Sequence, residues 1–315
     1  MRQKQLQGFS GTSGIVPASI CVCLLKAWSL FLLGSLGLAF LTQGSIVQAQ
    51  SKGALSSVSP LLTRTTTRRE ARRFGYGGTF TIVGAPQGSI TIEGWTRNEV
   101  EIIANIEQQA RTEQELNTLT TVNGFVFSED FNHLQVLTVG THDKVYMKRV
   151  APRLPKELLG LPWKIDYRIR VPVVTDVELN AGRGPLKVTG VEGALRITAT
   201  ETEGQLALTG GVVSAMIAAG NILVTIPVRS WRGGGADIRL ATGQLTVELP
   251  SGFNGDIDAD VLRIGGIEES FGGLEPRERR SLTERTLRAR AGSGGAFFKF
   301  MVGDGKLHIK KLTGG

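Results

Sequence analysis

Apolar and polar residues alternate strictly in several short runs in the first half of the chain. Phe80 and Ile82 occupy one side of the first run, and Ile90 and Ile92 occupy one side of the next. Residues i and i+2 lie on the same side of a strand, so each run has one apolar and one polar face. Segments rich in glycine and proline separate the runs and predict turns. The alternation predicts β-strands in residues 79–172.

The alternation is less regular between residues 111 and 166. Residues 112–119 predict a short helix, and the apolar residues of 125–137 predict further strands. Residues 151–163 contain three prolines and predict a rigid surface loop. Trp163, at the end of this loop, is interpreted as a hydrophobic plug over an open end of the core, with a ligand platform as the alternative.

A short unit recurs after residue 172: a turn glycine, a variable residue, and an apolar–polar–apolar triplet. Clear copies begin at Gly184, Gly193, Gly204, Gly220, Gly243 and Gly305. The triplets predict these inward pairs: Leu186/Val188, Leu195/Ile197, Leu206/Leu208, Ile238/Leu240, Leu245/Val247 and Leu307/Ile309. They predict that these residues face outward: Lys187, Arg196, Arg239, Thr246 and His308. Strands this short cannot bury an apolar face alone, so the units are expected to stack.

Successive copies start 8 to 11 residues apart, which fits two strands in each coil of roughly 20 residues. Sandwiches built from hairpins give a similar spacing. Polar residues keep the same slot in successive copies, and this favours a solenoid because equivalent positions then stack in ladders. The pattern therefore predicts an all-β fold, with a β-solenoid of short stacked strands over residues 173–315.

Two segments lack this pattern. Residues 50–78 are rich in Ser, Thr and Arg without an apolar period, and they predict a solvated linker. The alternative is an electrostatic tether to an anionic envelope surface. Residues 274–290 are highly charged and predict an exposed loop or short helix near the end of the repeats, covering the last open edge.

Composition and charge narrow the class of protein. The chain has 41 glycines among 315 residues, above the average of roughly 7 %, which suits many tight turns. The formal net charge of +8 comes from the first 73 residues and leaves residues 74–315 formally neutral. The folded part thus has no net attraction for a polyanion, and the sequence predicts no nucleic-acid partner.

The first 49 residues predict a signal peptide. Lys26 precedes the apolar residues 27–41, and small residues precede a cleavage position after Ala49. A second apolar patch precedes Lys26, so the alternatives are a true start further downstream or an uncleaved signal anchor. Both cysteines, Cys21 and Cys23, lie in this leader, so a cleaved chain has no disulfide and no thiol nucleophile. Cleavage would also leave no stable transmembrane span. An exported protein of the periplasm, cell surface or medium is predicted.

Candidate chemistry is sparse in the sequence. His133, His142 and His308 do not have the spacing of metal ligands, and no cofactor motif occurs. Asp256, Asp258 and Asp260 project from one face of a predicted strand and are a weak candidate cation site. A flat row of carboxylates converges poorly on calcium, so the solvated outer face of a strand is the favoured interpretation.

Four segments resemble a known family. They begin at Gly88, Tyr167, Asn180 and Gly303, and their glycine-and-turn patterns resemble the bacterial putative-adhesin family, a β-strand-repeat domain of unknown function. The resemblance covers roughly residues 75–315, with residues 111–166 departing from it. It implies a right-handed, head-domain-like β-solenoid outside the cytoplasm with an adhesin or surface-scaffold role. The family offers no catalytic residues to transfer.

The sequence thus predicts a signal peptide (1–49), a basic linker (50–78), an N-terminal β-strand region with an irregular insertion (79–172) and a β-strand-repeat solenoid (173–315). The predicted function is non-enzymatic, namely a putative adhesin, a surface-binding protein or an envelope scaffold. Its expected partners are envelope glycans or surface proteins. The alternative is a carbohydrate-active β-helix enzyme, a lyase or hydrolase, which could use Asp256 and Asp258. The sequence does not define an oligomeric state.

Overall fold

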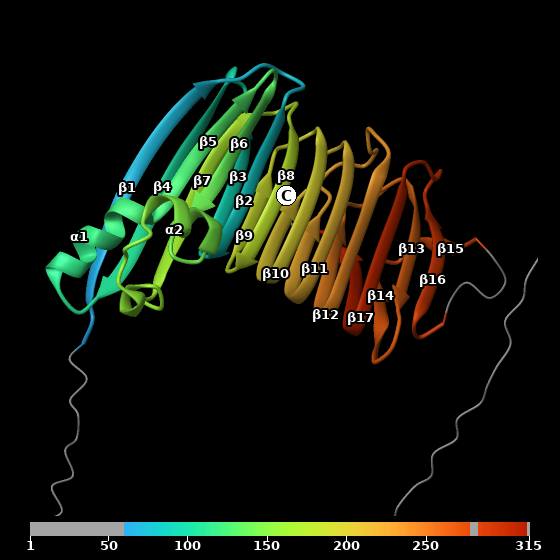
Figure 1. Cartoon of the computed structure of the whole chain (residues 1–315). Helices are drawn as coiled ribbons and strands as arrows, with labels where there is room; N and C mark the ends of the chain where they lie inside the picture. Colours follow the sequence, from blue (N-terminus) through green and yellow to red (C-terminus); the bar gives the residue numbers. More distant parts are fainter. Residues whose placement is uncertain (1–59, 278–282, 314–315) are drawn as a thin grey trace, which may run out of the picture. The chain divides into compact units, whose positions relative to one another are not determined.

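The computed structural model describes residues 60–277 and 283–313 (Figure 1), so the predicted signal peptide lies outside the described residues. Strands dominate this part of the chain and confirm an all-β protein. The strands are β1 (Leu62–Arg73), β2 (Thr79–Gln87), β3 (Ile90–Trp95), β4 (Glu99–Ala110), β5 (Gly124–Asp130), β6 (His133–Val139), β7 (Trp163–Pro172), β8 (Asp176–Arg183), β9 (Leu186–Thr189), β10 (Ala194–Ala207), β11 (Val212–Thr225), β12 (Gly235–Leu249), β13 (Gly255–Val261), β14 (Gly265–Ser270), β15 (Leu274–Pro276), β16 (Thr286–Ala291) and β17 (Phe297–Lys311).

Two short helices and one 3₁₀ turn interrupt the strands. Helix α1 (Glu113–Val122) follows β4 and confirms the helix predicted near residue 112. Thr112 caps it, because the Thr112 hydroxyl accepts a hydrogen bond from the Glu115 backbone N–H. Helix α2 (Lys144–Val150) and the turn η1 (Lys156–Leu158) occupy the connection between β6 and β7. No helix among residues 60–277 and 283–313 combines the length and the apolarity needed to cross a membrane.

The repeats form parallel strands that pair in a constant register. Val177 of β8 pairs with Leu195 of β10, and Leu195 pairs with Val213 of β11. Equivalent residues are therefore 18 positions apart in the sequence, close to the predicted coil of roughly 20. The long strands β10, β11, β12 and β17 each bend near the middle (Figure 1). They pair with one another along their whole length. At the two ends of this group, the halves of β10 pair with β8 and β9, and the halves of β17 pair with β13 and β14.

The 17 strands belong to one hydrogen-bonded sheet, but the bends divide it into two halves. Half-sheet I has the order β5–β6–β2–β8–β10–β11–β12–β17–β13–β16–β15, using the first halves of the long strands. Half-sheet II has the order β1–β4–β7–β3–β9–β10–β11–β12–β17–β14, using their second halves.

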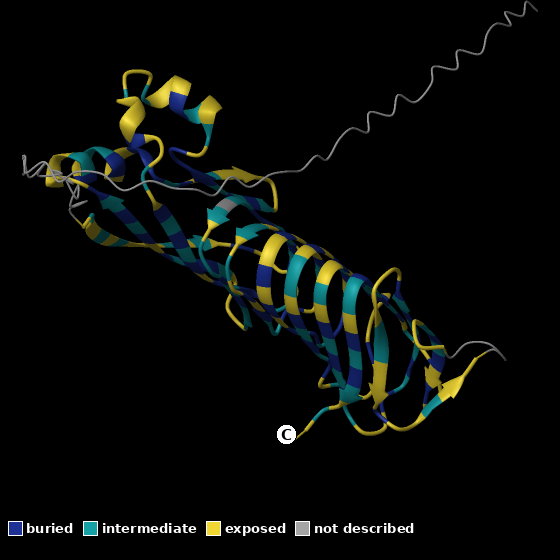
Figure 2. Ribbon diagram, turned by 90° about the horizontal axis from the view of Figure 1, so that it is seen from below, coloured by how far each residue is buried: buried dark blue, intermediate teal, exposed yellow. Residues whose placement is uncertain are grey.

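The inner faces of the two half-sheets enclose one apolar core. All twelve residues predicted to point inward from the triplets are buried, with at most 2 % of their surface exposed. Buried and exposed residues alternate along the strands, as Figure 2 shows. Lys187, Arg196 and Arg239 are exposed, while Thr246 and His308 are half-buried on the outer side. The triplet pattern therefore placed the core correctly.

The last strand of the chain does not lie at the end of the array. Strand β17 pairs in parallel with β12 on one side and with β13 and β14 on the other. The chain leaves β12 and skips one position to form β13 and β14. It then turns back through β15 and β16 before β17 fills the skipped position (Figure 1). Spatial order and sequence order thus differ in this part of the fold.

The prediction of a solvated linker over residues 50–78 is wrong for its described second half. Residues 62–73 form β1, a strand antiparallel to β4 along its whole length. Its inner face carries arginines in place of apolar residues, and Arg68 and Arg72 pack on aromatic rings. The Arg68 guanidinium carbon lies 4.3 Å from the Phe125 ring centre, and that of Arg72 lies 4.7 Å from the Phe127 ring centre. Such cation–π packing gives no apolar period in the sequence.

The prediction of a loop or short helix over residues 274–290 is also wrong where the segment is described. Leu274–Pro276 and Thr286–Ala291 form the antiparallel strands β15 and β16, which extend half-sheet I beyond β13. In β16 the inward residues Leu287, Ala289 and Ala291 are buried, and arginines alternate with them. The high charge of the segment hid this alternation.

Candidate functional site

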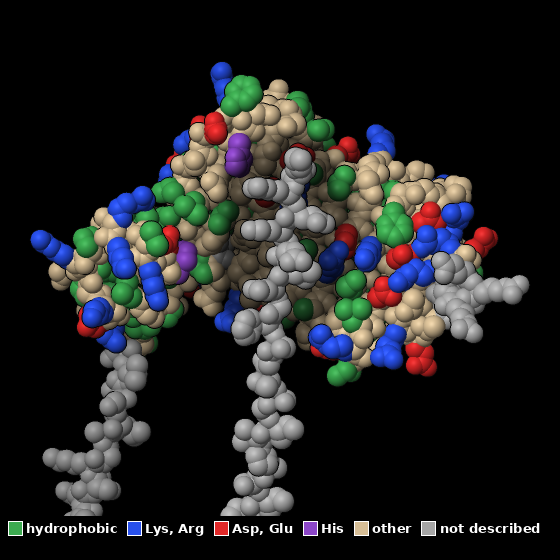
Figure 3. Space-filling view, turned by 45° about the vertical axis from the view of Figure 1, so that its right-hand side comes forward, with side chains coloured by type: hydrophobic (Ala, Val, Ile, Leu, Met, Phe, Trp, Pro, Cys, Tyr) green, Lys and Arg blue, Asp and Glu red, His purple; other side chains and the backbone are tan. Residues whose placement is uncertain are grey.

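The outer face of half-sheet II carries aligned rows of polar side chains. The constant register brings equivalent outward residues of neighbouring strands side by side, about 4.8 Å apart. One row contains Gln205, Thr246 and His308 on β10, β12 and β17, with Leu223 of β11 between the first two, and the next contains Glu203, Asn221, Gln244 and Lys306. In space filling, charged side chains of both signs are interspersed over the view in Figure 3. We consider the outer face of half-sheet II, from β1 to β14, as the candidate functional surface.

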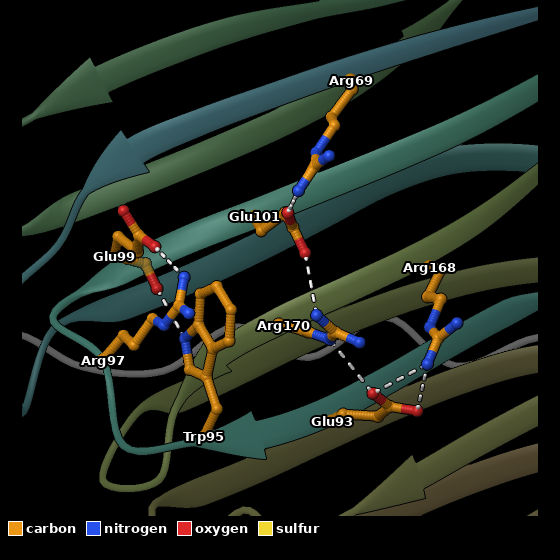
Figure 4. Close-up of polar contacts among 8 residues, drawn as sticks. All are labelled: Arg69, Glu93, Trp95, Arg97, Glu99, Glu101, Arg168 and Arg170. Atoms are coloured by element: carbon orange, nitrogen blue, oxygen red, sulfur yellow. Dashed lines mark hydrogen bonds and ion pairs between the residues drawn. The ribbon is translucent and has the colours of Figure 1, made fainter.

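An arginine–glutamate network crosses the N-terminal part of this surface (Figure 4). Arg69 of β1 donates hydrogen bonds to Glu101 of β4, one of them over 3.0 Å. Arg170 of β7 donates to Glu101 over 3.2 Å and to Glu93 of β3 over 3.3 Å. Arg168 completes the row with two contacts of 3.4 Å to Glu93. The network thus ties four neighbouring strands, β1, β4, β7 and β3, through their outward side chains.

Glu101 is the central carboxylate of this network, with only 7 % of its side chain exposed. Hydrogen bonding from Arg69, together with the positive charges of Arg69 and Arg170, lowers the pKa of Glu101 from its ordinary value of 4.5, although burial opposes the shift. A lowered pKa in the folded state means that the ionised carboxylate stabilises the fold at neutral pH. This stabilisation is lost as the pH falls below 4.5 through the lowered value.

Replacing Glu101 by glutamine is therefore expected to destabilise the fold at pH 7 by about 2 kcal/mol, since two charge-assisted contacts are lost. The difference from the parent protein should shrink as the pH falls below 4.5. Urea unfolding at pH 7 and pH 3.5 checks both effects. Glu99→Gln on the same strand is the control: its pair with Arg97 is more exposed, so it should cost under about 1 kcal/mol. Equal losses at both pH values would contradict the assignment.

Trp95 lies at the end of β3 beside this network (Figure 4). Its indole N–H donates a 2.8 Å hydrogen bond to the Glu99 backbone carbonyl, which fixes the ring. The guanidinium carbons of Arg97 and Arg170 lie 5.1 and 5.6 Å from the ring centre. The ring is half-buried, so part of a rigid aromatic surface flanked by cations remains accessible.

The C-terminal part of the candidate surface contains a shallow groove over β10, β11 and β12, lined mainly by amide, hydroxyl and charged groups. Asn221 donates from its side-chain amide to Glu203 over 3.0 Å. Glu248 accepts from the Thr225 hydroxyl over 3.3 Å and pairs with Lys310 over 3.2 Å. The exposed amides of Gln205 and Gln244 line the same groove. This part of the surface offers both donors and acceptors in fixed positions.

At the weak candidate cation site, the carboxylates form ion pairs with arginines. Asp256, Asp258 and Asp260 do lie on one face of β13, as the sequence predicted, but each pairs with an arginine of a neighbouring segment. Arg290 donates to Asp256 over 2.9 Å, and Arg288 donates to Asp260 over 2.8 Å and pairs with Asp258 over 3.3 Å. Arg277 also pairs with Asp258. These carboxylates join β13 to β16. Within the described ranges, no group of three or more His, Cys, Asp or Glu side chains could hold a metal ion.

The three histidines each contact a different partner. His133 is within 2.9 Å of the Thr81 hydroxyl, and His308 pairs with Glu268 over 3.0 Å on the candidate surface. The His142 ring packs at a tilt against Trp163 with ring centres 5.3 Å apart, and burial lowers the pKa of His142. Trp163 is the first residue of β7 and is buried, so its ring packs rather than projecting as a ligand platform.

Comparisons with known proteins give only distant similarities. No protein-family model matches the sequence, and no curated protein is significantly similar to it. A putative cell adhesion protein from Clostridium sporogenes aligns with 78 % of this chain and 100 % of its own, at 14 % identity and a TM-score of 0.41.

Two further solved structures align over a similar part of the chain. A putative adhesin from Bacteroides fragilis covers 78 % of this chain and 97 % of its own, at 10 % identity and a TM-score of 0.25. A putative lipid binding protein from Parabacteroides distasonis covers 79 % of this chain and 97 % of its own, at 10 % identity and a TM-score of 0.22. All three scores are below 0.5, so the function of this chain has to be argued from its own residues.

Proposed function

We propose that this protein is a non-enzymatic, extracytoplasmic binding or scaffold protein whose ligand-binding surface is the outer face of half-sheet II. The observation that carries the proposal is the alignment of Glu203, Asn221 and Gln244 with Lys306 across four neighbouring strands. Regularly spaced amides and charges on a rigid sheet suit a ligand that repeats along its own length. Envelope glycans have that property and present hydroxyl groups that such side chains can bind.

The architecture we propose is a right-handed β-solenoid. The parallel pairing of β8, β10 and β11 with an 18-residue offset, followed by the parallel pairing of β11 with β12, supports a coil of short stacked strands. The proposed export rests on the leader, with its apolar stretch before Ala49. Because the scaffold is formed by the core, the outward residues can vary without changing it, which is suitable for a binding surface.

The ion pairs of the three aspartates of β13 favour a binding function for this protein over a carbohydrate-active enzyme. Asp256, Asp258 and Asp260 each pair with arginines that join neighbouring strands, so they act in packing. Glycosidases need two carboxyl groups that face the scissile bond of the substrate. In this row the carboxylates face arginine side chains instead.

Binding to envelope glycans tests the proposal. The double substitution Asn221→Ala and Gln244→Ala removes two amides from the groove, and we expect roughly tenfold weaker retention on immobilised cell-wall polysaccharide. Asn180→Ala, which removes an exposed amide from the outer face of half-sheet I, is the matched control and should not change retention. Equal retention by the parent and the double variant would contradict the proposed surface. Turnover of the polysaccharide, lost in Asp258→Ala, would instead establish the enzyme.

A further inference from the structure

Strand β1 lies at one end of half-sheet II and has an open edge (Figure 1). It pairs with β4 through twelve consecutive residues, from Leu62 to Arg73, without a register shift. Among the described residues, no strand pairs with its other edge. Every second residue of this edge therefore presents its backbone N–H and C=O groups to solvent. An edge of this length without a bulge is a ready template for another strand.

Side-chain contacts hold β1 in its extended conformation along its length. On the inner side, Arg64 donates to Asn117 of α1 over 2.7 Å, and Arg68 donates to the Phe125 backbone carbonyl over 2.9 Å. Arg72 pairs with Glu129 over 3.1 Å. Arg69 joins the network of Glu101 on the outer side. A strand that is already ordered loses little conformational entropy when a partner is added to its edge.

The charge of β1 limits what can pair with it. The strand contains five arginines and one glutamate, a formal charge of +4. Arg69 has 70 % of its side chain exposed. Arg73, at the end of the strand, is exposed and makes no ion pair with any described residue. Like charges directly opposite each other destabilise a strand pair, so two copies of β1 would repel each other. Acidic side chains opposite the same positions would be attracted.

We propose that the open edge of β1 binds an extended acidic segment of a partner protein as an added β-strand. Backbone hydrogen bonds to the edge would supply affinity, and glutamate or aspartate opposite Arg69 and Arg73 would select the partner. This site is separate from the glycan groove over β10–β12, so either proposal can fail without the other. The added strand of the partner would extend half-sheet II by one position beyond β1.

The test uses the full chain and a fluorescent ten-residue peptide of alternating glutamate and threonine, with a glutamine–threonine peptide as the neutral control. We expect the acidic peptide to bind, as measured by anisotropy at low salt, and the neutral peptide to bind much more weakly. Arg73→Glu should weaken binding about fivefold, because an attractive cross-strand pair becomes repulsive. Arg232→Glu, at an exposed position of the connection between β11 and β12, should leave binding unchanged.

Hydrogen exchange distinguishes strand addition from simple charge attraction. Added hydrogen bonds should slow exchange of amides within residues 62–73, and nowhere else to the same extent. Three results would overturn the proposal: no binding of the acidic peptide, equal binding by the Arg73→Glu variant, or binding without protection of residues 62–73. Self-association of the parent protein that protects residues 62–73 from exchange would assign the edge to a second copy of this chain instead, and would equally overturn it.

Discussion

Substituting alanine for Gly243 is expected to destabilise the protein by about 4 kcal/mol, a large part of the stability of an ordinary domain. Gly243 lies where β12 bends from half-sheet I to half-sheet II, and its φ is +134°. Residues with a side chain rarely adopt this conformation. A Cβ atom at this position would also lie 1.9 Å from the backbone oxygen of Gly220 on the neighbouring strand. Neither atom can move without breaking the parallel pairing of β11 and β12.

Alanine substitutions at two other glycines distinguish the cost of backbone strain from the cost of steric overlap. Gly272 has a φ of +65°, but a Cβ atom added there would meet no heavy atom within 4 Å, so Gly272→Ala should cost about 1 kcal/mol. Gly160 has neither feature, and Gly160→Ala should lie within about 0.5 kcal/mol of the parent protein. Urea unfolding of the three variants checks this order. A Gly243→Ala midpoint equal to that of Gly160→Ala would show that the bend tolerates a side chain.

The repeats were predictable from the sequence because their signal is local. An apolar–polar–apolar triplet such as Leu245–Thr246–Val247 fixes which side chains point inward, whatever strand lies beside it. For the same reason, the triplet pattern does not indicate which strands lie beside a given strand. Residues 305–309 have the same pattern as residues 243–247, and nothing local indicates that β17 separates β12 from β13. The insertion depends on contacts between residues far apart in sequence.

The candidate surface was predictable only in part, for the same reason. The sequence identified Lys187, Thr246 and His308 as outward residues, because they occupy the middle of triplets. It did not identify the network around Glu101, whose partners Arg69 and Arg170 lie 32 and 69 residues away. Alternating strands with a glutamate on the polar face are common. Whether such a glutamate forms an ion-pair network depends on which strands lie beside its own. Rows of charged residues that form across neighbouring strands leave no periodic pattern in the sequence.

The inserted position of β17 makes the C-terminal strand essential to the fold. In an array of repeats that stack in sequence order, each unit contacts only its neighbours, and loss of a terminal unit removes a single interface. Here the last strand of the chain lies between two others, β12 and β13. A chain that ends at residue 296 would lose strand partners on both sides of the gap. It would also lose buried side chains of the core: Phe298, Phe300, Val302, Leu307 and Ile309.

The loss from truncation at residue 296 is therefore expected to be roughly 10 kcal/mol, taking about 2 kcal/mol for each buried side chain. That is comparable to the whole stability of a typical domain. We expect the truncated chain to lose strand signal in circular dichroism and to become sensitive to protease after β12. Truncation after Lys311 removes no strand and should leave both properties unchanged. Full resistance to protease in the chain that ends at 296 would contradict the insertion.

A synthetic peptide of residues 297–311 should restore the truncated chain, since the gap it fills is bounded by strands from the rest of the protein. Specificity would come from the alternation: Phe298 and Phe300 must enter the core while Lys299 and Met301 face outward. A peptide of the same composition with inward and outward residues exchanged should not restore the fold. Recovery of strand signal and protease resistance with the native peptide alone would show that β17 recognises a gap defined by its neighbours. Recovery with both peptides would mean that apolar content, and not register, is enough to close the core.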